Sequence, residues 1–323
     1  MTIPPGFWSG LLAQLLHLAL MLGLAPLLVG VVRWLKARLM GRRGPSPLQP
    51  WRDILRLLRK QPLLAESASI VSTATPYAAL AATVAASALV PGFAHGMTLA
   101  PLADLILIGG LLAVSRFALA LAGMDVGTAF GDLGAARAMS FAVFAEPAFI
   151  LSVLGFAILA GGTNLDAVGL AFAEGGQGVR VSLLLSLLAL LAVALAENGR
   201  LPVDNPASHL ELTMVHEAML LESSGRYLAL WEMQAALRLM LWLALLAALF
   251  LPMGTAPPGG GLLPWLFGLM AWLCKIGLLA LGLSLMESAI ARMRVFRVPE
   301  FLGAALLLAL LGAVFLFLSA GVA

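Results

Sequence analysis

Charged residues and cysteine are scarce in this chain of 323 residues. Asp, Glu, Lys and Arg together make up 11% of it, whereas 62% of its residues are hydrophobic. Soluble domains carry about 25% charged residues, so the composition excludes a soluble globular protein. The one cysteine, Cys274, excludes an internal disulfide and an iron–sulfur cluster held by this chain alone, which needs about four ligands. We interpret Cys274 as a small buried hydrophobic residue.

Long polar stretches are also missing, and the N-terminal residues do not show the pattern of a signal peptide. Because no stretch is polar and long enough for a separate soluble domain, we expect residues 1–323 to form a single integral membrane domain. The N-terminus has neither a basic region nor a clear cleavage site, and residues 8–32 are long enough to span a membrane. Residues 8–32 are therefore expected to be a retained helix.

Hydrophobic runs of about 20 residues recur along the chain and predict an all-α, polytopic membrane protein with about eight spanning helices. The expected spans are residues 8–32, 69–90, 101–124, 138–160, 179–196, 227–251, 263–285 and 301–321. Residues 48–60 are too short to span. Their apolar residues Leu48, Trp51, Leu55 and Leu58 recur at helical spacing, which predicts an amphipathic helix on the membrane surface.

The basic residues are concentrated in connections between spans, which indicates membrane topology and not nucleic-acid binding. Nine of the 19 lie between residues 33 and 60, so this first connection is expected in the cytoplasm. Alternation then places residues 125–137, 197–226 and 286–300 on the same side, and both termini outside. We find no internal repeat, so the inverted-repeat organisation of many carriers has no support.

Residues 197–226 are an acidic segment between two very apolar ones, and they hold five of the 16 acidic residues. Gly199, Pro202 and Pro206 predict a structured, non-helical re-entry. A short helix is expected after it, with Glu211 and Glu222 on one face. The segment is interpreted as a hydrated proton entry or a dock for basic partner surfaces, with a solvated loop as the alternative. Its acids are Glu197, Asp204, Glu211, Glu217 and Glu222.

Ionisable residues also lie within or near the spans, where a centred charge costs about 3 kcal/mol. They are Arg116, Glu146, Glu232, Arg238, Lys275 and Glu287. One interpretation is a set of ion pairs that hold helices together. The other is a proton relay, because burial raises the pKa of a carboxyl group and a neighbouring cation lowers it. The sequence pattern does not distinguish the ion pairs from the proton relay.

No residue pattern in the chain indicates catalysis or a metal site. His209 and His216 lie near Glu211 and Glu217, but this spacing matches no zinc signature. A glycine-rich nucleotide fingerprint and a hydrolase triad are also missing. We therefore predict no catalytic residue, no metal and no cofactor held by this chain alone.

Several motifs together resemble the membrane protein known as subunit 1 of respiratory complex I. Residues 42–53 (RRGPSPLQPWRD) and 55–60 are similar to its first cytoplasmic loop, and residues 131–137 with Glu146-Pro147 are similar to its second. Glu197-x-x-Arg200-x-Pro202-x-Asp204 resembles its third signature. Within that superfamily, residues 123–130 (GMDVGTAF) and 286–294 (MESAIARMR) look more like the membrane-anchor subunits of the energy-converting group 4 hydrogenases, hydrogenase-4 and formate hydrogenlyase.

The resemblance implies a subunit of the bacterial or archaeal inner membrane that anchors a hydrophilic electron-transfer arm and couples redox chemistry to proton or sodium translocation. Nickel–iron and iron–sulfur centres are then expected in hydrophilic hydrogenase or dehydrogenase partners, beside antiporter-like membrane subunits. The acids assigned to the proton path are Glu146, Glu197, Asp204, Glu211, Glu217, Glu222 and Glu232. The residues assigned to a chamber or to ion pairs are Arg43, Gln49, Arg116, Asp125, Arg137, Arg200, Arg238 and Lys275.

The chain also departs from the complex I pattern. An aromatic residue of that pattern is replaced by Ser223, and two of its acids by Ala207 and His209. The first loop is shorter, and Glu211 and Glu222 are further apart. Fewer acids in residues 197–226, together with the shorter first loop, favour the hydrogenase branch. The quinone-chamber subunit of a complex I-like dehydrogenase is the alternative, and a stand-alone ion transporter is a third hypothesis.

Overall fold

The computed structural model describes residues 7–173, 181–204, 215–290, 293 and 297–321. Every regular element in these ranges is a helix, so the predicted all-α architecture is confirmed. Seven helices are long and apolar enough to cross a membrane. They are α1 (Phe7–Leu39), α3 (Ile70–Leu89), α4 (Leu105–Asp125), α5 (Ala129–Ala160), α9 (Gly225–Phe250), α10 (Leu262–Ala289) and α11 (Val298–Gly321).

The remaining expected span, residues 179–196, corresponds to the shorter apolar helix α7 (Val181–Glu197). Its 17 residues lie at the lower limit of the range for a spanning helix. The other elements are α2 (Gln49–Leu58), the 3₁₀ helix η1 (Ala100–Leu102), α6 (Leu165–Ala173) and α8 (His216–Leu220).

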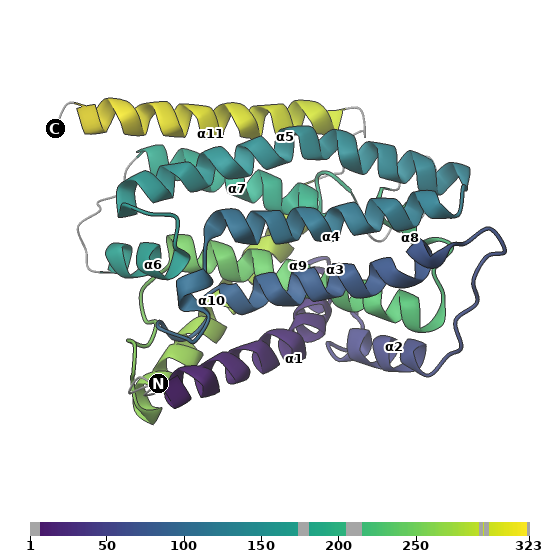
Figure 1. Cartoon of the computed structure of the whole chain (residues 1–323), viewed down its shortest axis with the longest axis horizontal. Helices are drawn as coiled ribbons and strands as arrows, with labels where there is room; N and C mark the ends of the chain where they lie inside the picture. The colour runs from purple at the N-terminus through teal and green to yellow at the C-terminus, as the bar shows by residue number, and fades with distance from the viewer. Residues whose placement is uncertain (1–6, 174–180, 205–214, 291–292, 294–296, 322–323) are drawn as a thin grey trace.

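The long helices run side by side, and the two ends of the bundle differ (Figure 1). The short helices α2 and α8 and the turn between α4 and α5 lie at the right-hand end, which we call the α2 end. Helix α6 lies at the left-hand end, where α1 begins and α11 ends, and we call this the α6 end. These described connections therefore lie at two different ends of the bundle, and the side of the membrane that each end faces stays a prediction.

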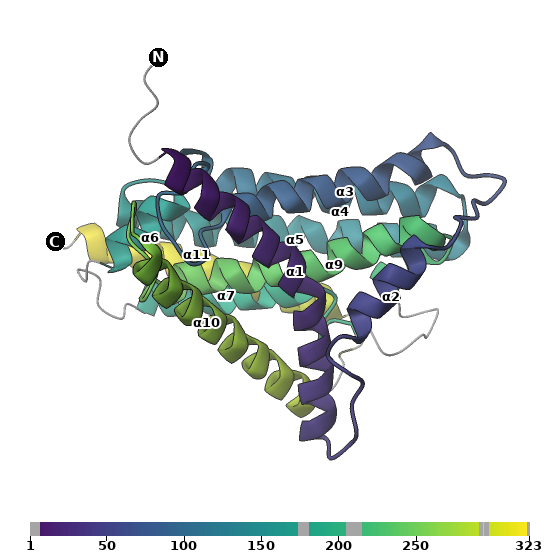
Figure 2. The same cartoon turned by 90° about the horizontal axis from the view of Figure 1, so that it is seen from below.

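Two helices are inclined to the rest of the bundle. Figure 2 shows α1 and α10 running away from the other helices and meeting at their C-terminal ends. Helix α1 contains Pro26, which removes one backbone hydrogen bond and accounts for its bend. Helix α9 is the most enclosed of the seven long helices, so a charge on it must be compensated by protein or water.

The amphipathic helix expected within residues 48–60 is confirmed as α2. It packs on α9 and α1 through buried Pro50 and Ile54, and the indole N–H of Trp51 donates to the carbonyl of Gly23 at 2.9 Å. Leu57 is half-buried, whereas Leu55, Leu58 and the N-cap residue Leu48 are exposed. They form an apolar face that the bundle does not cover, as expected for a helix at the membrane surface.

The expectation that Cys274 is buried is wrong. The thiol lies on an exposed part of α10. This helix contacts the bundle along one stripe that includes Trp272, Ile276 and Glu287, and Cys274 lies off that stripe. Hydropathy alone does not distinguish a residue that faces protein from one that faces lipid, because both environments are apolar.

Candidate functional site

Three ionisable residues that are far apart in the sequence meet in the middle of the bundle. Arg116 of α4 donates from Nη1 to Glu197, the last residue of α7, and from Nη2 to Glu146 of α5. The side chains of Arg116 and Glu197 are 10% and 8% exposed, whereas that of Glu146 is 51% exposed. A guanidinium fork between two carboxylates forms strong charge-assisted hydrogen bonds.

A cavity of about 190 Å³ lies against this cluster, between α4, α5, α7 and α9. Its walls are apolar, with Phe149 and Trp242 among them, and the three charged groups are the ionisable part of its lining. The exposed Glu146 therefore gives water or a neighbouring group access to the buried Arg116 and Glu197.

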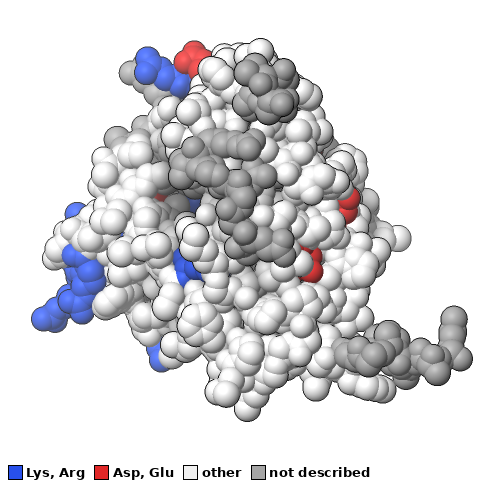
Figure 3. Space-filling model, turned by 90° about the vertical axis from the view of Figure 1, so that its left-hand side faces the viewer, with Lys and Arg blue, Asp and Glu red and all other residues white. Residues whose placement is uncertain are grey.

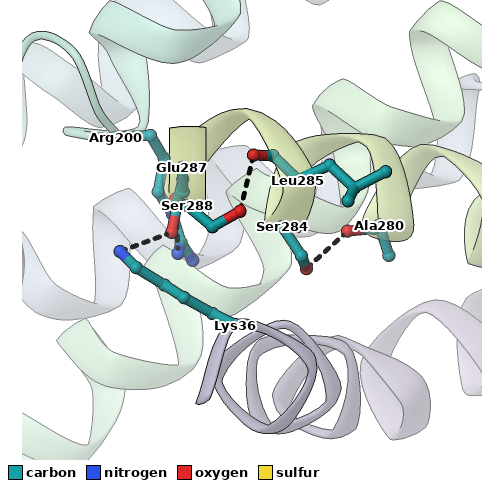
Figure 4. Close-up of polar contacts among 7 residues, drawn as sticks. All are labelled: Lys36, Arg200, Ala280, Ser284, Leu285, Glu287 and Ser288. Carbon is teal, nitrogen blue, oxygen red and sulfur yellow. Dashed lines mark hydrogen bonds and ion pairs between the residues drawn. The ribbon is translucent and has the colours of Figure 1, made fainter. Parts of the chain in front are cut away.

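A second cluster joins α1, α10 and the turn after α7 (Figure 4). Glu287 of α10 accepts from Nζ of Lys36 at 3.1 Å and from Nη1 of Arg200 at 3.3 Å, and its side chain is only 2% exposed. Burial lowers the pKa of the Arg200 guanidinium below its ordinary value, and Glu287 opposes part of that shift. The sequence singled out Glu287 and Arg200, whereas Lys36 was used only as a sign of topology.

Arg238 of α9 lies between the two clusters. It interacts electrostatically with Glu197 and Arg116 of the first cluster and with Arg200 of the second. The residue is 5% exposed, and its Nε and Nη1 have no hydrogen-bond partner within the part of the chain that the structure describes. Buried donors of this kind are usually completed by water.

These groups form a continuous series across the bundle, which we call the charge ladder. Its members alternate in sign at most steps and come from α5, α4, α7, α9, the turn after α7, α10 and α1. They are Glu146, Arg116, Glu197, Arg238, Arg200, Glu287 and Lys36.

The first part of the acidic segment is a buried turn, as predicted for the non-helical re-entry. Val203 and Asp204 donate their backbone N–H groups to the carbonyl of Arg200 at 2.9 and 3.1 Å. Gly199 has φ +55°, and a Cβ there would lie 2.9 Å from Nδ1 of His216. Asp204 is buried and accepts from the backbone N–H of Val215 at 3.4 Å. The turn thereby brings Arg200 into contact with Glu287.

His216 lies beside the ladder, a position that the sequence did not indicate. Burial lowers its pKa from 6.5 to about 3, with a further contribution from Arg238 and Arg116. The imidazole is therefore neutral at physiological pH. Its only sequence signal was its place within the acidic segment.

The predicted acidic helix is shorter than expected. Glu211 lies outside the described residues, and α8 covers only His216–Leu220. Glu217 is on this helix, but Glu222 lies beyond its end and is exposed. The helix ends because Ser223 donates to the carbonyl of Leu220 at 2.9 Å, which closes a turn. The expectation that Glu222 continues the same helix is therefore wrong.

Several other predicted site residues have partners outside the ladder. Gln49 donates to Asp53 on its own helix at 2.9 Å. Asp125 accepts from the hydroxyl and backbone N–H groups of Ser69 and Ser72, so it caps the start of α3.

The last four predicted residues are spread over the molecule. Glu232 is exposed on α9, where Arg33 and Asp53 interact with it electrostatically. Arg43 is exposed between α1 and α2, and Arg137 is half-buried on α5. Lys275 lies on α10 and borders a cavity that also contacts His95.

Comparisons with known proteins agree with this architecture. A family model described as NADH dehydrogenase matches residues 12–318. Hydrogenase-4 component C of Escherichia coli is 34% identical over 281 residues, which cover 85% of this chain and 86% of that protein. Formate hydrogenlyase subunit 4 of the same organism is 31% identical over 291 residues, with 90% and 93% covered.

A solved structure shows the same fold. A chain in the structure of the membrane-bound sulfane sulfur reductase, an archaeal respiratory membrane complex, aligns with a TM-score of 0.79 at 22% identity and covers 94% of this chain and 98% of its own length. The family model spans nearly the whole chain. This multi-pass membrane protein therefore belongs to the NADH dehydrogenase subunit 1 family.

Proposed function

We propose that this chain is the membrane anchor of an energy-converting hydrogenase or formate hydrogenlyase-like complex, and that its charge ladder couples redox chemistry to the movement of protons or sodium ions. The observation that carries the proposal is the ladder itself, which connects a half-exposed carboxylate, Glu146, with the buried Glu287. The names of the two Escherichia coli relatives support the hydrogenase branch.

Charge compensation explains how such a ladder transmits a change. Each carboxylate of the ladder has a cation beside it, and each cation has a carboxylate that compensates its charge. If Glu197 takes up a proton, Arg116 keeps only Glu146, and Arg238 loses a compensating charge. The next groups along the ladder then bind protons or water differently. Water at the open donors of Arg238 would complete the path.

The hydrophilic arm is proposed to dock at the α2 end, which we assign to the cytoplasm. The basic first connection with α2 supports this sidedness, as does the acidic segment with α8 at the same end. Nickel–iron and iron–sulfur centres belong to the docked partner subunits in this proposal, and antiporter-like subunits are expected beside the bundle in the membrane.

Purification of the tagged chain from its native membrane tests the proposal. Recovery of a nickel–iron subunit with iron–sulfur proteins is the expected result. The quinone-chamber alternative predicts quinone reductase activity and no nickel–iron subunit. Gln49 gives that alternative little support, since its amide is bonded to Asp53 of its own helix. A monomer that transports ions in liposomes would overturn the anchor function.

A second experiment tests the relay. In the assembled complex, Glu197→Gln removes one charge of the ladder and keeps the size of the side chain. We expect coupled turnover to fall by about tenfold or more, which corresponds to at least about 1.4 kcal/mol, while assembly persists. The matched control is Glu66→Gln, because Glu66 is an exposed acid in the first connection. Full coupled activity in Glu197→Gln would exclude the relay role of Glu197.

A further inference from the structure

A histidine and an aspartate form a second polar site at the α6 end, away from the charge ladder. His95 lies between α3 and η1, and Asp166 is in the first turn of α6. Nδ1 of His95 is 2.5 Å from Oδ1 of Asp166, and the side chains are 6% and 12% exposed. A carboxylate at Nδ1 favours the proton on that nitrogen and leaves Nε2 as the exchanging position.

The backbone around His95 is held in place by three connections. The N–H of His95 donates to the carbonyl of Ala256 at 2.9 Å, and the N–H of Ala256 donates to the carbonyl of Phe93 at 2.9 Å. Gly96 donates to Oδ2 of Asp166 at 3.0 Å. Gly268 of α10 permits the approach, since a Cβ there would lie 2.2 Å from the carbonyl oxygen of Phe93. The imidazole is thus pre-positioned.

A small cavity lies beside the imidazole. It has a volume of about 10 Å³, close to the minimum for a single water. Nε2 of His95 and Nε1 of Trp272 are both buried, both residues line this cavity, and neither atom has a hydrogen-bond partner among the described residues. Thr255 and Lys275 also line it. A water there would therefore have polar neighbours on several sides.

Lys275 connects this cavity to the surface. Its side chain is half-buried, and no ion pair to it is found in the described ranges. Together with Pro252 it also borders a second hollow of about 270 Å³, whose other walls include Leu251 and Met253. Figure 3, which looks onto the α6 end, shows a face dominated by uncharged residues with few acidic groups.

We propose that His95, Asp166 and Lys275 form a proton-exchange site with one bridging water. A proton passes from Nζ of Lys275 to the water, and a proton of that water passes to Nε2 of His95. One N–H bond breaks at the lysine and one forms at the histidine, so the charge moves and no redox partner is needed. Asp166 compensates the imidazolium, and the reverse transfer restores the ammonium group.

The ionisable groups around His95 come from three elements. They are Asp166 of α6, Lys275 of α10 and His17 of α1, whose ring meets that of Trp272 edge-on with centroids 6.0 Å apart. Helix α9 contributes only the alanines Ala244, Ala247 and Ala248 to the cavity. The protonation of His95 should therefore depend on one carboxylate and one ammonium group, with opposite signs.

Histidine NMR of the assembled, ¹⁵N-histidine-labelled complex in lipid nanodiscs tests the site. The signal of His95 is identified by its loss in His95→Gln. We expect Asp166→Asn to lower the apparent pKa of His95 by about one unit or more, and Lys275→Met to raise it. Arg297→Met, at an exposed position just before α11, is the charge control and should leave the signal unchanged. A His95 titration that neither Asp166→Asn nor Lys275→Met alters would overturn the site.

That the site releases protons at the α6 end rests on the proposed function. This role is tested by a separate measurement. In proteoliposomes, we expect His95→Gln and Lys275→Met to lower the ratio of protons moved to hydrogen formed at least twofold, and Arg297→Met to leave it unchanged. An unaltered ratio in both site variants would overturn the exchange role. If the wild-type complex forms no hydrogen, the proposed function fails, and the NMR titration still decides whether the site exists.

Discussion

The charge ladder and the His95–Asp166 site solve the same physical problem in different ways. Both place ionisable groups in an apolar bundle, where an uncompensated charge is costly. In the ladder, Glu287 lies between Lys36 and Arg200, so either cation still compensates it if the other moves. At the α6 end, the described ion pair of Asp166 is with His95 alone, and Nε2 of the imidazole stays open.

The number of compensating partners therefore separates two roles of buried ionisable groups. A carboxylate that contacts two cations holds two helices and a turn together, so it contributes to folding and to electrostatic coupling. A histidine with one carboxylate and an open nitrogen can bind a further group at that nitrogen without losing an existing contact. We therefore expect substitutions in the ladder to affect stability and coupling strongly, and substitutions at the α6 end to affect proton exchange with little loss of stability.

The largest effect is expected for Glu287→Ala. It leaves the buried Arg200 and the partly exposed Lys36 without their shared carboxylate, and loss of one member of a buried ion pair costs about 5 kcal/mol at the upper end. The solubilised complex is heated, and the measurement is the midpoint temperature at which half of this chain has precipitated. Glu66→Ala is the control for an exposed acid. Equal midpoints for the two variants would show that Glu287 does not stabilise the junction of α1, α10 and the turn after α7.

The next effect separates the two acids that share Arg116. Glu197 is 8% exposed and Glu146 is 51% exposed, so Glu197→Ala should cost about 3 kcal/mol and Glu146→Ala about 1 kcal/mol or less. The same heating assay compares them. If Glu146→Ala proved the more destabilising substitution, the exposed fractions of the two carboxylates would not explain their contributions to stability.

A smaller effect concerns pH and His216. Because burial holds its pKa near 3 in the folded chain, the unfolded chain takes up a proton first as the pH falls below 6.5. This residue therefore lowers stability progressively between pH 6.5 and pH 3, by at most about 2 kcal/mol at pH 5. In His216→Gln, the drop in the heating midpoint from pH 6.5 to pH 5 should be smaller than in the wild type. An unchanged drop would mean that His216 is protonated in the folded protein.

The smallest effect is expected at the α6 end. Gly96 has φ +67°, and a Cβ there would lie 2.8 Å from Cβ of Pro258. Gly96→Ala should cost about 1–2 kcal/mol through backbone strain. Because Gly96 donates to Asp166, the same variant should also broaden the NMR signal of His95. A signal as sharp as in the wild type would show that Gly96 does not hold the dyad.

Hydropathy predicted the spans well and their ends less well. Residues 138–160 were expected as a span, but α5 covers Ala129–Ala160. The helix begins earlier because the hydroxyl of Thr128 accepts from the N–H of Gly131 at 3.4 Å, and it ends at Gly161 with φ +75°. Hydropathy reports the part of a helix that lies in hydrocarbon, whereas capping determines where the helix begins and ends.

The candidate site was predicted residue by residue but not as an arrangement. Arg116, Arg238 and Glu287 were singled out because ionisable residues are rare in spans. Their partners were not predictable, since Arg116 and Glu197 are 81 residues apart and Lys36 and Glu287 are 251 apart. His95 and Asp166 lie outside the membrane-spanning helices, where ionisable residues are common, so hydropathy did not single them out.

The sequence by itself determined that this is an all-α, multi-pass membrane protein, because few charges and long apolar runs leave helices that satisfy their own backbone as the stable solution. Its motifs also predicted the family, which the family model over residues 12–318 confirms. Only the tertiary structure decided which charges meet. Ion pairing depends on the distance between side chains on different helices, and helix packing sets that distance. Packing places Arg238 between the two clusters, and it leaves Nε2 of His95 open beside Lys275.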